Sequence, residues 1–124
     1  MATVSIKLNW TFEHFLTYVL FVVAGADMNV DENELSEIKE IITNNNDTTI
    51  SYEQLADDVK KILMLQPHIE EKEAFIKENK HLFLTNEDKK DFFIDCIENV
   101  IVADLHIDEG EFLTYRTIKK SLTE

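Results

Sequence analysis

Apolar side chains recur at helical spacing along most of the chain, and two segments are apolar on nearly every side. The first covers residues 10–26 and the second covers residues 86–103. A helix that is apolar on most sides belongs at the centre of a fold, so we predict two central helices that pack together. The stripe of the first helix consists of Phe12, Phe15, Val19, Val22 and Ala26. The stripe of the second consists of Phe92, Phe93, Cys96, Ile97, Val100 and Ile101.

Four other segments carry a thinner apolar stripe, which is typical of amphipathic helices. One helix is predicted to begin at Asp31 and to bury Leu35, Ile38, Ile41 and Ile42. Another is predicted to follow Ser51, with a stripe of Tyr52, Leu55, Val59, Ile62 and Leu63. A charge-rich helix near Pro67 is expected on the outside, with Ile69, Phe75, Ile76 and Phe83. The last is predicted to begin at Asp108 and to bury Phe112, Tyr115, Ile118 and Leu122.

Polar residues indicate where these helices start and where the chain turns. Ser51 is followed three residues later by Gln54, which is the spacing of a capping box at a helix start. Thr85 has the same spacing to an aspartate, a weaker partner, and is predicted to cap the second central helix. The polar residues 43–49 predict a loop. Pro67 suits either the first turn of a helix or a kink within one longer helix.

The predicted fold class is all-α, a compact bundle of about six helices built from two similar helical hairpins. The third and fourth helices are expected to bridge these hairpins. The chain has only two Gly and one Pro, a poor supply of turn residues for a many-stranded β protein. Its 124 residues fit a single domain over 1–124. Residues 3–8 alternate apolar and polar side chains, which predicts that residues 1–8 form an extended arm covering the core or a second copy of the protein.

The composition indicates a globular, acidic and cytoplasmic protein. Apolar residues make up 44% of the chain, and the formal net charge is −13. That charge repels nucleic acid and anionic lipid surfaces and attracts cations or a basic protein partner. Its simpler role is to solvate helix faces. The single cysteine, Cys96, is expected to pack as a small hydrophobe. The longest apolar run, residues 18–26, is shorter than the roughly 20 residues of a membrane span, so no membrane insertion is expected.

One acidic stretch occurs twice, each time between a central helix and an amphipathic one. The two copies are offset by 77 residues (104 − 27). If the central helices pack with both turns at one end, two acidic clusters face each other, and a bound divalent cation would relieve their repulsion. Oxygen ligands favour calcium or magnesium over copper or zinc. The candidate metal ligands are Asp27, Asp31 and Glu34 in the first copy and Asp104, Asp108 and Glu111 in the second.

An alternative assigns each of these acids a structural role. Asp31 with Glu34 has capping-box spacing, as has the equivalent pair in the second copy, and such a cap is worth about 1 kcal/mol. Asp27 and Asp104 can accept backbone hydrogen bonds two residues on, as in Asx-turns. Both alternatives remain open, because an ionised carboxylate has about four lone-pair sites and can cap and coordinate together.

The twin motif, helix–Ala-Asp-x-x-Val/Ile-x-x-x-Glu–helix in a small acidic chain, resembles the TerB-like family associated with tellurite resistance. The likeness covers residues 12–42 and 90–122, although the family's usual glycine after the aspartate is Met28 or Leu105 here. The resemblance implies a six- or seven-helix domain with no established enzymatic activity and a place in stress response. It also implies a metal-binding role for the paired acids, which here are Asp27, Glu34, Asp104 and Glu111, with Asp31 and Asp108 beside them.

Other chemistry has weaker support in the sequence. Neither acidic turn is an EF-hand loop, because Ile38 and Tyr115 stand where that loop needs a glutamate. His14, His68 and His81 lack partners at metal spacing, so a surface or partly buried position is expected for each. No phosphate loop or nucleophilic constellation is present, so we do not predict an enzyme, and a hydrolase using the acids is only a third hypothesis. The first is a non-enzymatic binding module; the second is a protein-interaction scaffold whose acidic turns are only helix caps.

Overall fold

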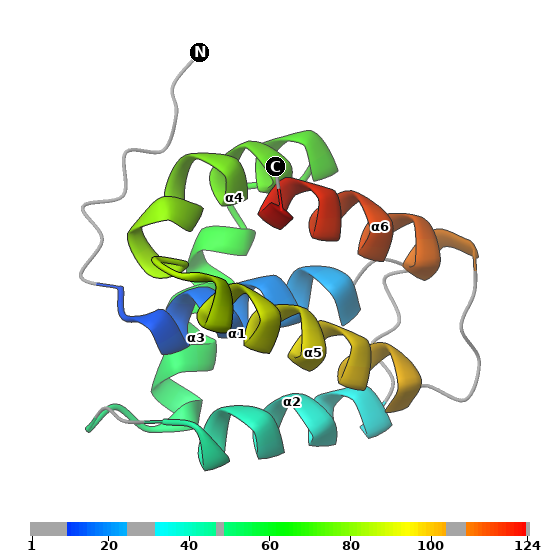
Figure 1. Cartoon of the computed structure of the whole chain (residues 1–124). Helices are drawn as coiled ribbons and strands as arrows, with labels where there is room; N and C mark the ends of the chain where they lie inside the picture. The colour runs from blue at the N-terminus through cyan, green and yellow to red at the C-terminus, as the bar shows by residue number, and fades with distance from the viewer. Residues whose placement is uncertain (1–9, 25–31, 47–48, 104–108, 124) are drawn as a thin grey trace.

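The computed structural model describes residues 10–24, 32–46, 49–103 and 109–123, and within these ranges the chain is all-α (Figure 1). The predicted bundle of six helices is confirmed. The helices are α1 (Phe12–Ala24), α2 (Glu32–Asn44), α3 (Tyr52–Leu63), α4 (Ile69–Phe83), α5 (Glu87–Ala103) and α6 (Glu109–Thr123). The predicted arm, residues 1–8, lies outside the described residues.

Helix α1 is the centre of the bundle, as its apolar girth predicts. It contacts all five other helices, and Figure 1 shows it surrounded by them. Eleven of its thirteen residues are buried. Helix α5 packs against it, as predicted, and the rings of Phe12 and Phe15 both lie 5.4 Å from the ring of Phe93. Every residue of α1 from Glu13 to Leu20 is buried, so none of these positions faces solvent.

The two helical hairpins interlock. Helix α2 packs against both α1 and α5, and α6 packs against the same two helices. The starts of α2 and α6, Glu32 and Glu109, are 77 residues apart (109 − 32), which is the offset of the acidic motif. Ile41 and Ile118 have the same offset (118 − 41), and both are buried. The sequence repeat therefore corresponds to a repeat in the helical packing.

Helices α3 and α4 cover α1 on its remaining sides. Helix α3 was expected to bridge the two hairpins. It also packs along α1 through the buried side chains of Leu55 and Val59. Helix α4 packs on α6 and on α1, and it buries Phe75, Ile76 and Phe83 as predicted. The bundle thus has a single apolar core centred on α1.

Several predicted helix limits need correction. Helix α1 begins at Phe12, and Trp10 lies before it, with its ring stacked on His14 and edge-on to Phe75. Helix α2 continues to Asn44, so the first two residues of the predicted loop are helical. Leu35 was expected in the buried stripe but is 40% exposed, because it lies in the first turn at the end of the bundle and burial begins one turn later.

The helix starts show which polar residues act as caps. The prediction for Ser51 is confirmed, since its hydroxyl accepts a 3.2 Å hydrogen bond from the backbone N–H of Gln54. The prediction for Thr85 is wrong: the side chain of Asn86 accepts the capping hydrogen bond, 2.8 Å from the backbone N of Lys89. Asparagine ranks above threonine as an N-cap residue, and here its side-chain oxygen accepts from the third helical N–H.

The segment between α3 and α4 is a true break in the chain. Helix α3 ends at Leu63 and α4 begins at Ile69, so the alternative of one kinked helix is wrong. Pro67 lies one residue before the N-cap residue His68, outside the first turn. At this start the backbone N–H of His68 donates to the Glu71 carboxylate at 3.3 Å. The first-turn glutamate therefore takes the capping role there.

Truncation of the core side chains tests the central position of α1 and α5. Phe15 and Ile97 are both 0% exposed, so Phe15→Ala and Ile97→Ala should each lower the free energy of unfolding by about 2–5 kcal/mol through cavity formation. Leu82→Ala is the matched control, because Leu82 is 55% exposed and its loss should cost about 0.5 kcal/mol or less. Equal losses for the three variants, measured by denaturant unfolding, would contradict this packing.

Candidate functional site

The acidic turns are attached to helices that run side by side in one direction. Helices α1 and α5 are in contact, and Figure 1 shows both running from the same side of the bundle to the other. Their first turns lie together, since Nζ of Lys89 in the first turn of α5 is 5.9 Å from the centre of the Phe12 ring in the first turn of α1. The ends of α1 and α5 and the starts of α2 and α6 therefore all lie at the opposite end of the bundle. Both acidic segments join helices at that one end.

The six predicted metal ligands lie outside what the structure describes. Asp27, Asp31, Asp104 and Asp108 fall in undescribed segments. Glu34 and Glu111 lie on the described helices α2 and α6, but their side chains are outside the description. Among the side chains that are described, no group of three or more His, Cys, Asp or Glu lies close enough to hold a metal ion. What the structure describes of the candidate site is therefore the helices on either side of the acidic segments, α1 and α5 before them and α2 and α6 after them.

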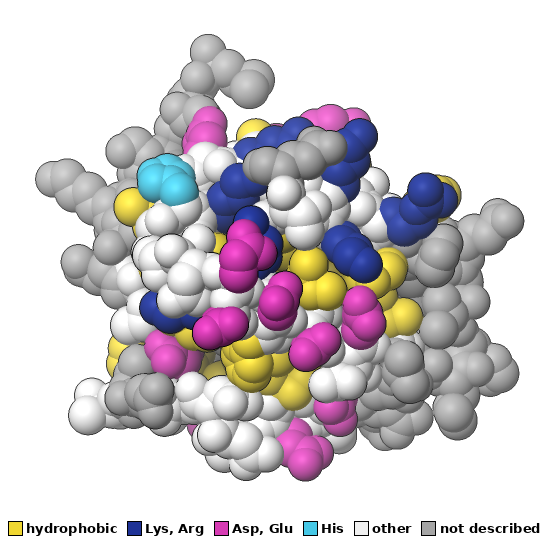
Figure 2. Space-filling view, viewed as in Figure 1, with side chains coloured by type: hydrophobic (Ala, Val, Ile, Leu, Met, Phe, Trp, Pro, Cys, Tyr) yellow, Lys and Arg dark blue, Asp and Glu magenta, His cyan; other side chains and the backbone are white. Residues whose placement is uncertain are grey.

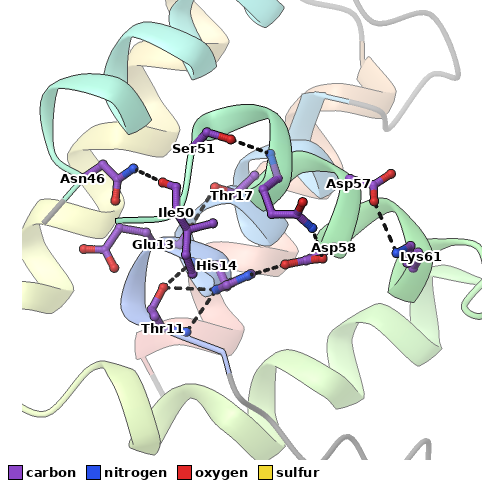
Figure 3. Close-up of polar contacts among 11 residues, drawn as sticks. Thr11, Glu13, His14, Thr17, Asn46, Ile50, Ser51, Asp57, Asp58 and Lys61 are labelled. Atoms are coloured by element: carbon purple, nitrogen blue, oxygen red, sulfur yellow. Dashed lines mark hydrogen bonds and ion pairs between the residues drawn. The ribbon is translucent and has the colours of Figure 1, made fainter. Parts of the chain in front are cut away.

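A second polar cluster joins α1 to α3 (Figure 3). Thr11 precedes α1 and acts as its cap, with its hydroxyl accepting a 3.3 Å hydrogen bond from the backbone N–H of His14. In return, Nδ1 of His14 accepts a 3.1 Å hydrogen bond from the backbone N–H of Thr11. This is a capping box in which imidazole replaces the usual carboxylate. Because Nδ1 accepts, the neutral ring carries its proton on Nε2.

The Nε2 proton of His14 points at a carboxylate on α3. The distance from Nε2 to Oδ2 of Asp58 is 2.9 Å, and His14 is only 2% exposed. The expectation that His14 lies on the surface or is partly buried is therefore wrong. The hydrogen bond from His14 is the main cause of a lowered pKa for Asp58, and Gln54 adds a second hydrogen bond at 2.8 Å. This pair fastens the first turn of α1 to α3.

The Thr11 hydroxyl, the His14 imidazole and the Asp58 carboxylate are not arranged for nucleophilic catalysis. A general base must use a free ring lone pair to take the hydroxyl proton. The single lone pair of His14 Nδ1 already faces the backbone N–H of Thr11, and the ring is stacked on Trp10 at 5.6 Å. The sequence carried a signal for this cap, a Thr followed three residues later by a His. The partner Asp58 is 44 residues away and has no local signal.

A groove of about 540 Å³ lies beside the first turns of α1 and α5. Its aromatic walls are Phe12 and Phe92, and polar groups come from Asn45 after α2 and from the start of α5. Glu13 also lines the groove, although it is only 7% exposed. Figure 3 shows its carboxylate pointing away from the pair of His14 and Asp58. Sequence reasoning missed Glu13, because one acid in an apolar stripe gives no spacing signal.

The remaining buried polar groups have structural roles. The Tyr18 hydroxyl donates to the side chain of Gln66, which is 4% exposed, and burial raises the pKa of Tyr18 above its usual range. Cys96 is buried as predicted, and burial raises the pKa of its thiol to about 12. A thiol held neutral in this way is a poor nucleophile. Neither group therefore forms a reactive site.

Comparisons with protein-family models, with curated proteins and with solved structures found no match for this chain.

The pair of His14 and Asp58 gives a pH-dependent contribution to stability. Because the pKa of Asp58 is lowered by folding, its contribution is present above the unfolded value of about 3.9 and is lost as the pH falls through the folded value. Asp58→Ala should therefore lower the free energy of unfolding by about 1–3 kcal/mol at pH 7, since the Nε2 proton of buried His14 loses its acceptor. The loss should shrink at pH 3.

The neighbouring acid supplies the control for this measurement. Asp57 pairs with Lys61 at 3.3 Å, but both side chains are more than half exposed. Asp57→Ala should therefore cost about 0.5 kcal/mol or less in unfolding experiments at pH 7. A cost for Asp58→Ala that matches this control, or that grows towards pH 3, would contradict the role assigned to the pair.

Proposed function

We propose that this chain is a TerB-like, non-enzymatic binding module whose two acidic turns together bind one divalent cation. The observation that supports this most is the parallel packing of α1 and α5, because these two helices precede the acidic segments in the chain and end on the same side of the bundle. Two segments that are 77 residues apart in sequence can then act on a single ion (104 − 27). Their candidate ligands are Asp27, Asp31 and Glu34, with Asp104, Asp108 and Glu111.

Electrostatics favours a cation at this end. The negative dipole ends of α1 and α5 are offset by the positive dipole ends of α2 and α6, which start at the same end, so the net negative charge comes from the acids of the two segments. No basic residue lies in the last turn of α1 or α5, as these helices are described, to compensate. A hard cation with oxygen ligands would neutralise this charge, which makes calcium or magnesium the proposed ion. Metal binding and helix capping are compatible at the same carboxylates.

A second candidate function is a protein-interaction scaffold whose acids only cap helices. One observation favours it: α2 begins at Glu32 and α6 at Glu109, each directly after an aspartate in the position of an N-cap. The partner would be a basic protein or a second copy of the chain. Figure 2 shows Lys and Arg side chains gathered over α6 and acidic ones over α5, so two copies have complementary surfaces. No helix in the described ranges has the length and apolarity to span a membrane.

The stability of the chelated protein separates the two functions. If the turns form one cation site, Asp27→Asn and Asp104→Asn should each weaken calcium or magnesium binding by about tenfold or more, and the double variant should lose less than the sum. Without metal, the same changes should raise the free energy of unfolding, because they remove like charges that face each other. If the acids are only caps, both changes should lower it, and their effects should add.

Calorimetric titration and denaturant unfolding in chelator provide these measurements. Asp57→Asn is the matched control, because it removes the same charge from an exposed position on α3. It should leave cation binding unchanged. An absence of heat with millimolar calcium, magnesium or manganese would exclude the cation site and leave the scaffold.

A further inference from the structure

We infer that the groove beside the first turns of α1 and α5 is a binding site for an organic cation, specifically an alkylguanidinium group. The groove lies at the end of the bundle opposite the acidic turns, so this site is separate from the proposed cation site. The central observation is Glu13, a carboxylate that is 7% exposed and lines the groove. None of the described residues forms an ion pair or a hydrogen bond with its carboxylate.

A buried carboxylate without a partner is costly, because it loses hydration and gains no hydrogen bond in return. Glu13 lies in the first turn of α1, where the helix dipole offsets part of that cost. The dipole does not supply a hydrogen-bond donor, and the Thr17 hydroxyl donates to the backbone carbonyl of Glu13, away from the carboxylate. The Glu13 carboxylate therefore lacks a positively charged hydrogen-bond donor, and a cation bound in the groove would supply one.

The groove also has the walls that an organic cation requires. Phe12 and Phe92 line it, and aromatic faces attract cations. Lys89 shows this attraction within the chain, since its Nζ lies 5.9 Å from the centre of the Phe12 ring. Asp88 adds a second carboxylate at the rim. The volume of about 540 Å³ lies within the usual range for small-molecule sites.

A metal ion fits this groove less well than a guanidinium group. The described side chains offer no group of three acidic, histidine or cysteine ligands, and the side-chain oxygen of Asn86 is already used to cap α5. The exposed ammonium of Lys89 repels a divalent ion more strongly than a singly charged group. A guanidinium can bind Glu13 with two parallel hydrogen bonds and stack on a phenylalanine ring. An ammonium group has no flat face for that stacking.

The probes are agmatine, a small alkylguanidinium, and a Gly-Arg-Gly peptide amide, titrated by calorimetry into the full chain. Binding of either probe is expected, and the two identify the source: agmatine alone indicates a small metabolite, and the peptide alone indicates the arginine of a protein partner. Glu13→Gln should weaken binding by about 30-fold or more, because it removes a buried charge. Glu78→Gln, an exposed acid on α4, is the matched control and should change nothing.

Two rim variants keep the test decisive if Glu13→Gln fails to fold. Asp88→Asn should weaken probe binding by about two- to fivefold, the effect of an exposed charge. Lys89→Met should leave binding unchanged or strengthen it, because it removes a competing positive charge. Loss of binding in Lys89→Met would show that the groove recognises an anion and would overturn the inference. Displacement of the probe by millimolar calcium, or no binding of either probe at about 10 mM, would also overturn it.

Discussion

Burial of α1 on every side is the constraint on which the rest of the structure depends. Residues Phe15, Tyr18, Leu20 and Ala24 are completely excluded from solvent, and at 3.6 residues per turn they belong to different faces of the helix. No single neighbour could cover such a helix, so five other helices pack around it. The hydrophobic effect has no direction of its own, and here the shape of one apolar helix decides where the others lie.

This central position carries consequences for both ends of the bundle. Because α5 packs along α1 in the same direction, both helices end on one side of the bundle, and an acidic segment follows each of them in the sequence. At the other end the first turns of α1 and α5 meet, where Thr11 caps α1 and Asn86 caps α5. At this second end a tertiary hydrogen bond of 2.9 Å between His14 and Asp58 fastens the start of α1 to α3. The two ends therefore differ in chemistry although the hairpins repeat.

Periodicity in the sequence predicted the helices and the central pair, because burial of an apolar face depends on spacing along one helix. It was less informative where the outcome depends on a neighbour in space. The stripe of α2 correctly includes Ile38 and Ile41, but spacing does not show that Leu35 lies at the edge of the bundle. His14 was misplaced for the same reason, since its burial is made tolerable by Asp58 on another helix. Of the candidate sites, only the acidic turns were predicted from the sequence, and their aspartates lie outside the described residues.

The groove illustrates a limit of reasoning from composition alone. With a net charge of −13, acids are expected throughout the surface, and one more glutamate carries no information. Glu13 differs because the packing of α1 removes it from solvent, which changes an ordinary acid into a costly one. Lys89, a cation in the lining of the same groove, lies over the Phe12 ring, and the ion pairs of the described residues include none between Lys89 and Glu13. A charge that folding buries and leaves without a partner is informative about what the protein binds, since an occupant of opposite charge lowers the cost that the free protein bears.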